Sequence, residues 1–103
     1  MKQIGIGDLV VSKQGRDKDT IYLVVDKLPN NYYLLSNGDN KKLDNPKKKI
    51  ISHIKPLDTS SQTIKNKLLS NAKVFDSEVY SFIRKYKESL KSEVIINLLN
   101  KQN

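Results

Sequence analysis

Residues 7–18, GDLVVSKQGRDK, decide how this chain is expected to fold. The apolar residues 9–11 are typical of a short strand, and a basic loop broken by Gly15 follows them. A second apolar run, residues 21–25, begins directly after that loop. Two such strands would hold the loop rigid while its cationic side chains stay in water. A rigid cationic loop on a small β scaffold suits a polyanion, and RNA is the natural candidate.

Turn signals divide the rest of the first half into short segments. Residues 28–31 predict a turn, because proline fixes φ and asparagine tolerates left-handed geometry. Asn37-Gly38 lies between apolar runs, which is the strongest short-range signal for a hairpin. The remaining predicted strands are residues 32–35, a returning strand at 41–43, and a last apolar segment at 50–54 that Pro56 closes.

Short strands joined by tight turns predict a small, strongly curved barrel rather than a wide open sheet. Successive side chains point to opposite faces of a strand. In the first predicted strand we therefore expect Leu9 and Val11 on one face and Val10 on the other. In the second we expect Ile21, Leu23 and Val25 on one face and Tyr22 and Val24 on the other.

The second half, residues 58–103, has a helical pattern. Residues 58–62 form a polar linker in which a helix can start, and Ile64 and Leu68 follow at helical spacing. Asp76 is expected to be the N-cap of the next helical stretch. An apolar stripe then recurs at steps of three and four and can continue through Val94 and Leu98; it comprises Val79, Phe82, Ile83, Tyr86 and Leu90.

That stripe leaves two questions open. The pattern does not say whether residues 77–100 form one helix or two. The stripe could dock on a partner protein or on a second copy of the chain, or it could pack back within the chain. A barrel of about fifty residues is only marginally stable alone, so we favour packing within the chain.

Composition limits the class of protein. The 103 residues suffice for one small domain, or for a very small domain with a helical appendage. Lys and Arg number 19 against 11 Asp and Glu, a net charge of +8, which predicts attraction to nucleic acid or to an anionic surface. Cysteine is absent, so the chain can form no disulfide, which fits a reducing cytosol. No signal-peptide pattern or membrane-length apolar run is present, so we expect a soluble, cytoplasmic protein.

The sequence offers little for catalysis. It contains no Walker-type phosphate loop and no Ser-His-Asp signature. His53 is the only histidine, and a lone histidine without Cys or His partners rarely binds a metal. We expect a structural role for His53 at the end of the barrel. The expected protein is therefore not an enzyme and has no cofactor, metal or catalytic residue.

Several of these segments together resemble a KOW motif. The resemblance begins with residues 7–10, 15–18 and 22–25, and it continues through Asn37-Gly38, Lys41-Lys42, residues 46–49 and residues 52–54. It covers about residues 4 to 56. The chain is similar to the small KOW-domain RNA-binding proteins of clostridial-type bacteria, which are similar in turn to certain large-subunit ribosomal proteins of archaea and eukaryotes.

The resemblance implies that the predicted barrel is an SH3-like KOW barrel. Together with the helical pattern of the second half, this gives an expected α+β protein, with the SH3-like KOW barrel over residues 1–57 and a helical C-terminal extension over residues 58–103. The resemblance also implies RNA binding through the first loop and the neighbouring basic residues. The family usually has glycine where this chain has Asp19; aspartate can adopt left-handed geometry, but its charge opposes a phosphate. The expected RNA-binding residues are Lys13, Gly15, Arg16, Lys18, Lys41, Lys42, Lys47, Lys48 and Lys49.

The expected function is therefore that of a non-catalytic RNA-binding module that contacts structured ribosomal RNA and works with the ribosome in translation. Ribosomal proteins are possible further partners, a membrane is not, and a monomer is favoured. The alternative is a protein-interaction adaptor in transcription or translation that uses the helical tail, with the basic surface only accessory. The sequence does not identify the RNA, nor does it separate a permanent ribosome component from a transient factor.

Overall fold

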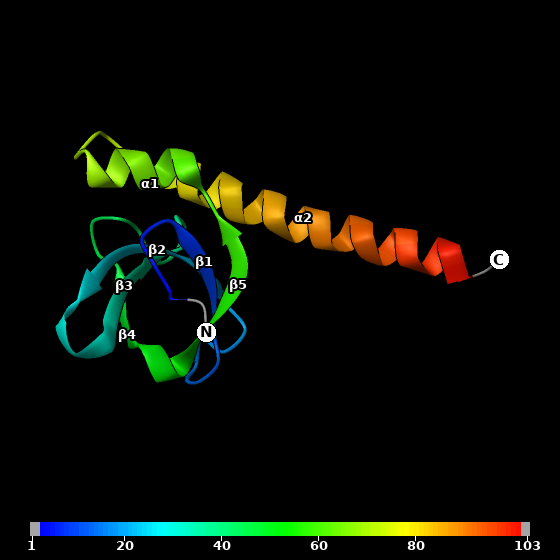
Figure 1. Cartoon of the computed structure of the whole chain (residues 1–103), viewed down its shortest axis with the longest axis horizontal. Coiled ribbons are helices and arrows are strands. Elements are labelled where there is room, and N and C mark those ends of the chain that lie inside the picture. Colours follow the sequence, from blue (N-terminus) through cyan, green and yellow to red (C-terminus); the bar gives the residue numbers. More distant parts are fainter. Residues whose placement is uncertain (1–2, 102–103) are drawn as a thin grey trace.

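A strongly curved antiparallel sheet carries two helices on one side (Figure 1). The computed structural model describes residues 3–101, and the side chains of residues 3–91. Within that range the sheet has five strands in the order β4-β3-β2-β1-β5. The elements are β1 (Asp8–Ser12), β2 (Ile21–Leu28), a 3₁₀ turn η1 (Pro29–Asn31), β3 (Tyr32–Ser36), β4 (Lys47–Ile50), a 3₁₀ turn η2 (Ile51–His53), β5 (Ile54–Ser60), α1 (Gln62–Leu69) and α2 (Asp76–Lys101). The α+β class is confirmed.

The segment after β3 differs from the predicted hairpin. Residues 41–43 do not return as a strand; β3 pairs with β4 instead, with Leu35 opposite Lys47 and Tyr32 opposite Ile50. The cause is local, because the side-chain oxygen of Asn37 accepts the N–H groups of Asp39 and Lys41 at 3.0 Å. This closes residues 37–41 into a turn of their own. An irregular loop, residues 37–46, therefore separates the two strands.

The last strand is longer than predicted. Pro56 does not close the β unit, since β5 continues to Ser60, past the boundary placed at residue 57. Proline is tolerated here because β5 is an edge strand of the sheet, with pairing on one side only. Its pairing with β1 shifts register between Asp8 and Val10, and Asp58 has a positive φ of 57° at this bulge.

Each face of the sheet has its own core, as the alternation of side chains predicts. The inner core lies within the curve of the sheet and comprises Ile4, Val10, Tyr22, Val24, Tyr33, Leu35 and Ile54. The outer core lies between the sheet and the helices and comprises Leu9, Leu23, Ile64, Val79 and Ile83, with Ile21 and Val25 packed at its margin. Leu9, Val10, Leu23 and Val24 are all completely buried, so both faces of β1 and of the first half of β2 are covered.

Two close approaches fix the helices to the sheet unit. A Cβ atom at Gly38 would lie 2.7 Å from the backbone nitrogen of Tyr80, and one at Gly7 would lie 2.7 Å from the Cβ of Lys65. Both glycines also have a positive φ, which L-residues with side chains rarely adopt. Glycine at these positions therefore lets the 37–46 loop touch α2 and lets the turn before β1 touch α1.

Helix α2 is a single uninterrupted helix, which answers the question left open by the sequence. Its first turn is not capped as predicted. The Asp76 carboxylate accepts the N–H of Leu43 at 2.8 Å, whereas Glu78 accepts the N–H of Phe75 at 3.1 Å, as the glutamate of a capping box does. Glu78 also pairs with Lys67 of α1, whose hydrogen bond lowers the pKa of Glu78.

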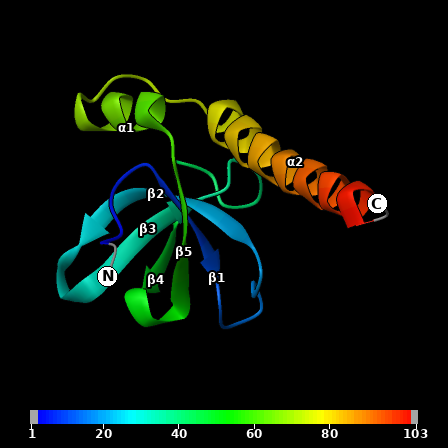
Figure 2. The ribbon, with the colours of Figure 1, turned by 45° about the vertical axis from the view of Figure 1, so that its right-hand side comes forward.

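The apolar stripe packs largely within the chain, as favoured. Val79 and Ile83 are buried in the outer core, and Phe82 and Tyr86 pack partly against it. Leu90 is 41% exposed, and the side chains of Val94 and Leu98 lie outside the described residues. The later turns of α2 extend beyond the sheet (Figure 2).

Candidate nucleic-acid interface

An open cleft of about 490 Å³ lies between the β1–β2 loop and the 37–46 loop. Residues from both loops, β2 and β4 form its walls. Four of the lining side chains are basic and one is acidic. The lining comprises Gly15, Arg16, Asp17, Thr20, Tyr22, Asn40, Lys41, Lys47 and Lys49, and we call it the cationic cleft.

Backbone hydrogen bonds hold the β1–β2 loop in one shape. The N–H of Ser12 donates to the carbonyl of Thr20 at 2.9 Å, and the N–H of Asp19 donates to the carbonyl of Ser12 at 2.8 Å. Gly15 and Asp19 both have a positive φ, of 95° and 74°. Asp19 thus adopts the left-handed geometry for which its position calls, and the turn keeps its shape without glycine.

Asp17 organises the base of this loop. Its carboxylate accepts hydrogen bonds from the hydroxyl of Ser12 at 3.0 Å and the hydroxyl of Tyr22 at 2.7 Å. It also pairs with the ammonium of Lys49 at 2.8 Å. Lys49 in turn donates to the carbonyl of Gln14 at 2.7 Å. A single carboxylate therefore connects the loop to β1, β2 and β4.

These contacts perturb the acid–base chemistry of the cluster. Desolvation acts to raise the pKa of Asp17, but hydrogen bonds from Lys49, Tyr22 and Ser12 and the charge of Lys49 outweigh it and lower that pKa to about 2. Burial, together with the hydrogen bond to Asp17, raises the pKa of Tyr22 well above its usual value. At neutral pH the site thus holds an ionised Asp17 and a neutral Tyr22.

The shifted pKa of Asp17 predicts acid sensitivity. Because the pKa is lower in the folded state, the ionised carboxylate stabilises the fold above about pH 4, and this contribution of about 2 kcal/mol is lost as pH falls toward 2. Asp17→Asn should be less stable than wild type at pH 7 and should lose less stability on acidification. Urea unfolding at several pH values measures both effects. Parallel pH profiles for the two proteins would contradict the assigned role.

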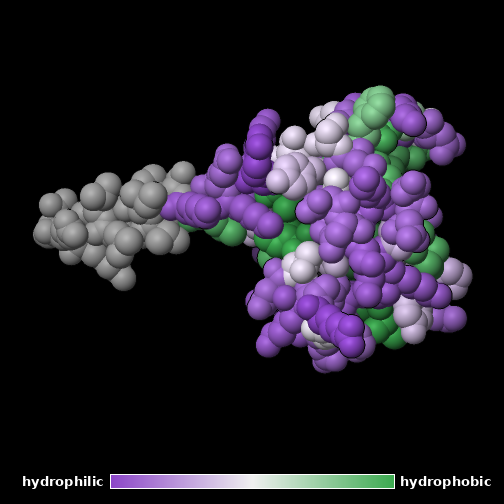
Figure 3. Space-filling view, turned by 180° about the vertical axis from the view of Figure 1, so that it is seen from behind, coloured by the Kyte–Doolittle hydropathy of each residue, from purple (hydrophilic) through white to green (hydrophobic). Residues whose placement is uncertain are grey.

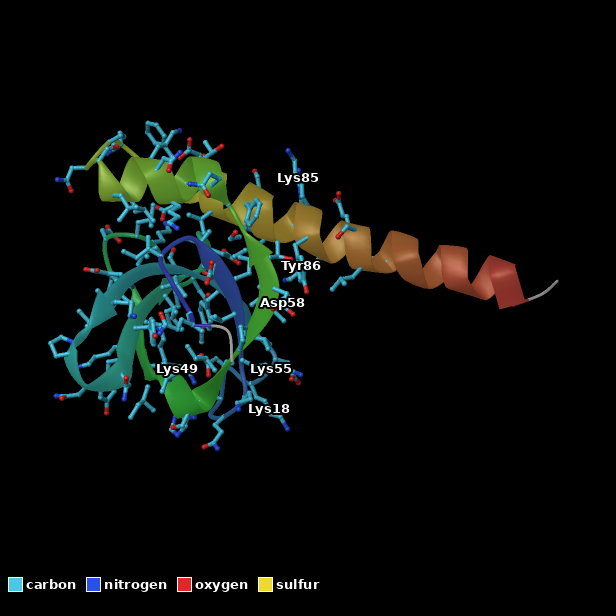
Figure 4. The ribbon with its side chains drawn as sticks, viewed as in Figure 1. Lys18, Lys49, Lys55, Asp58, Lys85 and Tyr86 are labelled. Atoms are coloured by element: carbon cyan, nitrogen blue, oxygen red, sulfur yellow. The ribbon has the colours of Figure 1, made fainter. Side chains whose placement is uncertain are left out.

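Alternation along β4 separates the three consecutive lysines. Lys47 and Lys49 face the cationic cleft, whereas the ammonium of Lys48 lies over the ring of Tyr32, 4.8 Å from its centroid. Lys49 is only 7% exposed, because its stem is buried and its ammonium is paired with Asp17. Lys49 is labelled in Figure 4, within the curve of the sheet. The three lysines therefore do not form one continuous cationic edge.

The predicted RNA-binding residues divide into two groups. The cleft brings Gly15, Arg16, Lys41, Lys47 and Lys49 together. Lys13, Lys18, Lys42 and Lys48 do not line it, although all four are exposed. Figure 4 shows Lys18 near Lys55 at the end of the sheet away from the helices. The His53 carbonyl accepts the N–H of Lys13 at 2.8 Å, a structural contact at that same end.

Sequence reasoning missed four residues that line the cleft: Asp17, Thr20, Tyr22 and Asn40. One signal was available for Tyr22, because a tyrosine on the inner face of a strand needs a partner for its hydroxyl. No local pattern indicates that Asp17 and Lys49 meet, since strands β2 and β3 lie between them in the sequence.

Arg16, Lys41 and Lys47 make no ion pair with any residue of the described range. The same range contains no cluster of His, Asp and Glu able to hold a metal ion, and none of its helices is both long and apolar enough to cross a bilayer. No protein-family model and no curated protein matches this sequence.

Proposed function

We propose that this chain is a non-catalytic RNA-binding module and that the cationic cleft is its principal interface. The observation that carries the proposal is that one of the four basic residues of the cleft is paired with its only acid, while the other three are not ion-paired. Asp17 is neutralised by the buried Lys49, whereas Arg16, Lys41 and Lys47 line the same cleft without an ion pair to any residue of the described range. Such a concave surface attracts phosphates.

The fold supports the same proposal. A curved five-stranded antiparallel sheet is what the resemblance to KOW proteins implies, and the basic loop lies between β1 and β2, as it does in that motif. We therefore propose an SH3-like barrel of the KOW kind, bound to structured ribosomal RNA and associated with translation. Phosphate contacts would supply affinity, and the fixed shape of the loop would select a folded RNA surface.

Titration of the full chain with fragments of large-subunit ribosomal RNA tests this function. Three phosphate contacts predict a slope of about −3 in a plot of log K against log salt concentration. Cosedimentation of the protein with ribosomal subunits tests the proposed association with the ribosome. If the chain binds no RNA at physiological salt, the proposal is wrong.

One observation favours the adaptor function as a second candidate. A groove of about 450 Å³ between β5 and α2 is lined by Leu57, Phe82, Tyr86 and Leu90, with Lys85 at its side. Figure 4 shows Lys85 and Tyr86 on this part of α2. The groove could receive a segment of another protein. Leu90→Glu should then reduce capture of ribosomal or transcription proteins without changing RNA affinity.

A further inference from the structure

A second hollow adjoins the cationic cleft on the side of the helices. It has a volume of about 200 Å³ and shares Thr20 with the cleft. The 37–46 loop lines both cavities: Asn37 and Asp39 line this hollow, and Asn40 and Lys41 line the cationic cleft. Its lining is Thr20, Ile21, Asn37, Asp39, Tyr80, Ile83, Arg84 and Lys87, and we call it the helix-side hollow.

One face of α2 forms the far wall of this hollow. Tyr80, Arg84 and Lys87 are spaced by four and three residues, so they project from the same side of the helix. Ile83 of the same wall is 5% exposed and anchors the helix in the outer core. Contact between Gly38 and the backbone of Tyr80 fixes the loop against this face. The wall is therefore held at a set position relative to the cleft.

The exposed groups of this wall are one aromatic ring, Tyr80, and two cations, Arg84 and Lys87. Tyr80 is 46% exposed, a large fraction for an aromatic ring beside a packed interface. The Nε atom of Arg84 lies 3.8 Å from Oε1 of Glu88, and both side chains are more than half exposed. Their ion pair is therefore weak. Asp39 is the one acid of the hollow, and it lies on the loop side, opposite the cations. From behind, the surface beside the described part of α2 is mostly hydrophilic, with a small hydrophobic area in the angle between helix and sheet (Figure 3).

We propose that the RNA-binding surface continues from the cationic cleft across Thr20 into the helix-side hollow and that this second half takes an unpaired RNA segment. An aromatic ring between cations is the arrangement that binds single strands, because bases stack on the ring while phosphates meet the charges. Tyr80 stacks one unpaired base, and Arg84 and Lys87 contact the phosphates beside it. This inference rests on the proposed function and adds the class of RNA: a structured element with a single-stranded continuation.

Two probes separate the two halves of the surface: a blunt RNA hairpin, and the same hairpin with a single-stranded extension. The variants are Tyr80→Leu, which removes the ring but keeps the packing atoms nearest Gly38, and Arg84→Glu/Lys87→Glu. The matched control is Lys73→Glu/Lys85→Glu, because it makes the same change in net charge at two exposed residues, of which Lys73 precedes α2 and Lys85 lines the opposite groove. Urea unfolding confirms that each variant remains folded.

We expect wild type to bind the extended hairpin more tightly than the blunt one. Tyr80→Leu should reduce affinity for the extended probe about tenfold. Arg84→Glu/Lys87→Glu should do the same and lower the magnitude of the salt slope by about 1.4. Both should change affinity for the blunt hairpin no more than the control does.

The outcomes that overturn the inference are distinct from failure of the proposed function. If wild type binds both hairpins equally, or if the Arg84 and Lys87 reversal acts no more strongly than the control, the helix-side hollow does not bind RNA, while the cationic cleft is unaffected. If wild type binds neither hairpin nor ribosomal RNA fragments, the proposed function and this inference are both wrong.

Discussion

Val79→Asp is expected to unfold the protein, or to leave it without fixed tertiary packing, at neutral pH. Val79 is completely buried in the outer core with Leu9, Leu23, Ile64 and Ile83. An ionised carboxylate there would have no cationic partner in that apolar cluster. The cost, about 4 kcal/mol or more, approaches the whole stability of a small domain. Circular dichroism and urea unfolding measure the loss.

Two further variants serve as controls for the loss of stability in Val79→Asp. Ser89 lies on the same helix and is exposed, so Ser89→Asp should change the free energy of unfolding by no more than about 0.5 kcal/mol. Val79→Ala removes methyl groups without adding charge and should fall between the two. If Val79→Asp unfolds at the wild-type urea concentration, α2 does not pack against the sheet.

The outer core explains which parts of the fold could be predicted from sequence. Alternation along residues 9–11 and 21–25 correctly separates Leu9 and Leu23 from Val10, Tyr22 and Val24. Both sets are apolar, which is typical of strands covered on both faces. The apolar stripe of α2, with Val79 and Ile83, packs against Leu9 and Leu23. Residues 1–57 alone would expose Leu9 and Leu23, so we do not expect them to fold as an independent unit.

Errors in the fold prediction occurred where side chains override local turn signals. Asn37-Gly38 does form a turn, but hydrogen bonds to the Asn37 side chain and the anchor between Leu43 and Asp76 keep the following residues from pairing. Asp76 and Leu43 are far apart in sequence, and a local pattern cannot show such a contact. Pro56 does not end the β unit, because proline is tolerated on an edge strand, and the position of β5 at the edge depends on the order of the whole sheet.

The candidate site shows the same limit. The resemblance to the KOW motif, together with loop chemistry, indicated Arg16 and the lysines after Pro46, but it could not separate Lys47, Lys48 and Lys49. That separation depends on strand alternation and on the pairing of Lys49 with Asp17. A charge reversal at Lys49 would place two carboxylates together in a mostly buried site and would destabilise the fold. Loss of RNA binding in such a variant would therefore not identify an RNA contact.

Arg16→Glu/Lys47→Glu avoids this ambiguity and is expected to have the largest effect on RNA binding. Both residues line the cationic cleft, Arg16 from the β1–β2 loop and Lys47 from β4, and neither is ion-paired within the described part of the chain. Each charged hydrogen bond to a phosphate contributes about 1.5–3 kcal/mol, so the double variant should bind ribosomal RNA fragments at least about a hundredfold more weakly. The magnitude of the salt slope should fall by about 2.

The position of the charges, rather than their sum, is what this variant tests. Lys73→Glu/Lys85→Glu lowers the net charge by the same amount at two exposed residues outside the cleft, so it should reduce affinity far less and leave the number of phosphate contacts unchanged. An equal loss of affinity in the two double variants, with equal salt slopes, would mean that RNA is attracted by the net charge of +8 alone. A loss confined to Arg16 and Lys47 would place phosphates between the β1–β2 loop and β4, because only a group seated in the cleft can contact both walls.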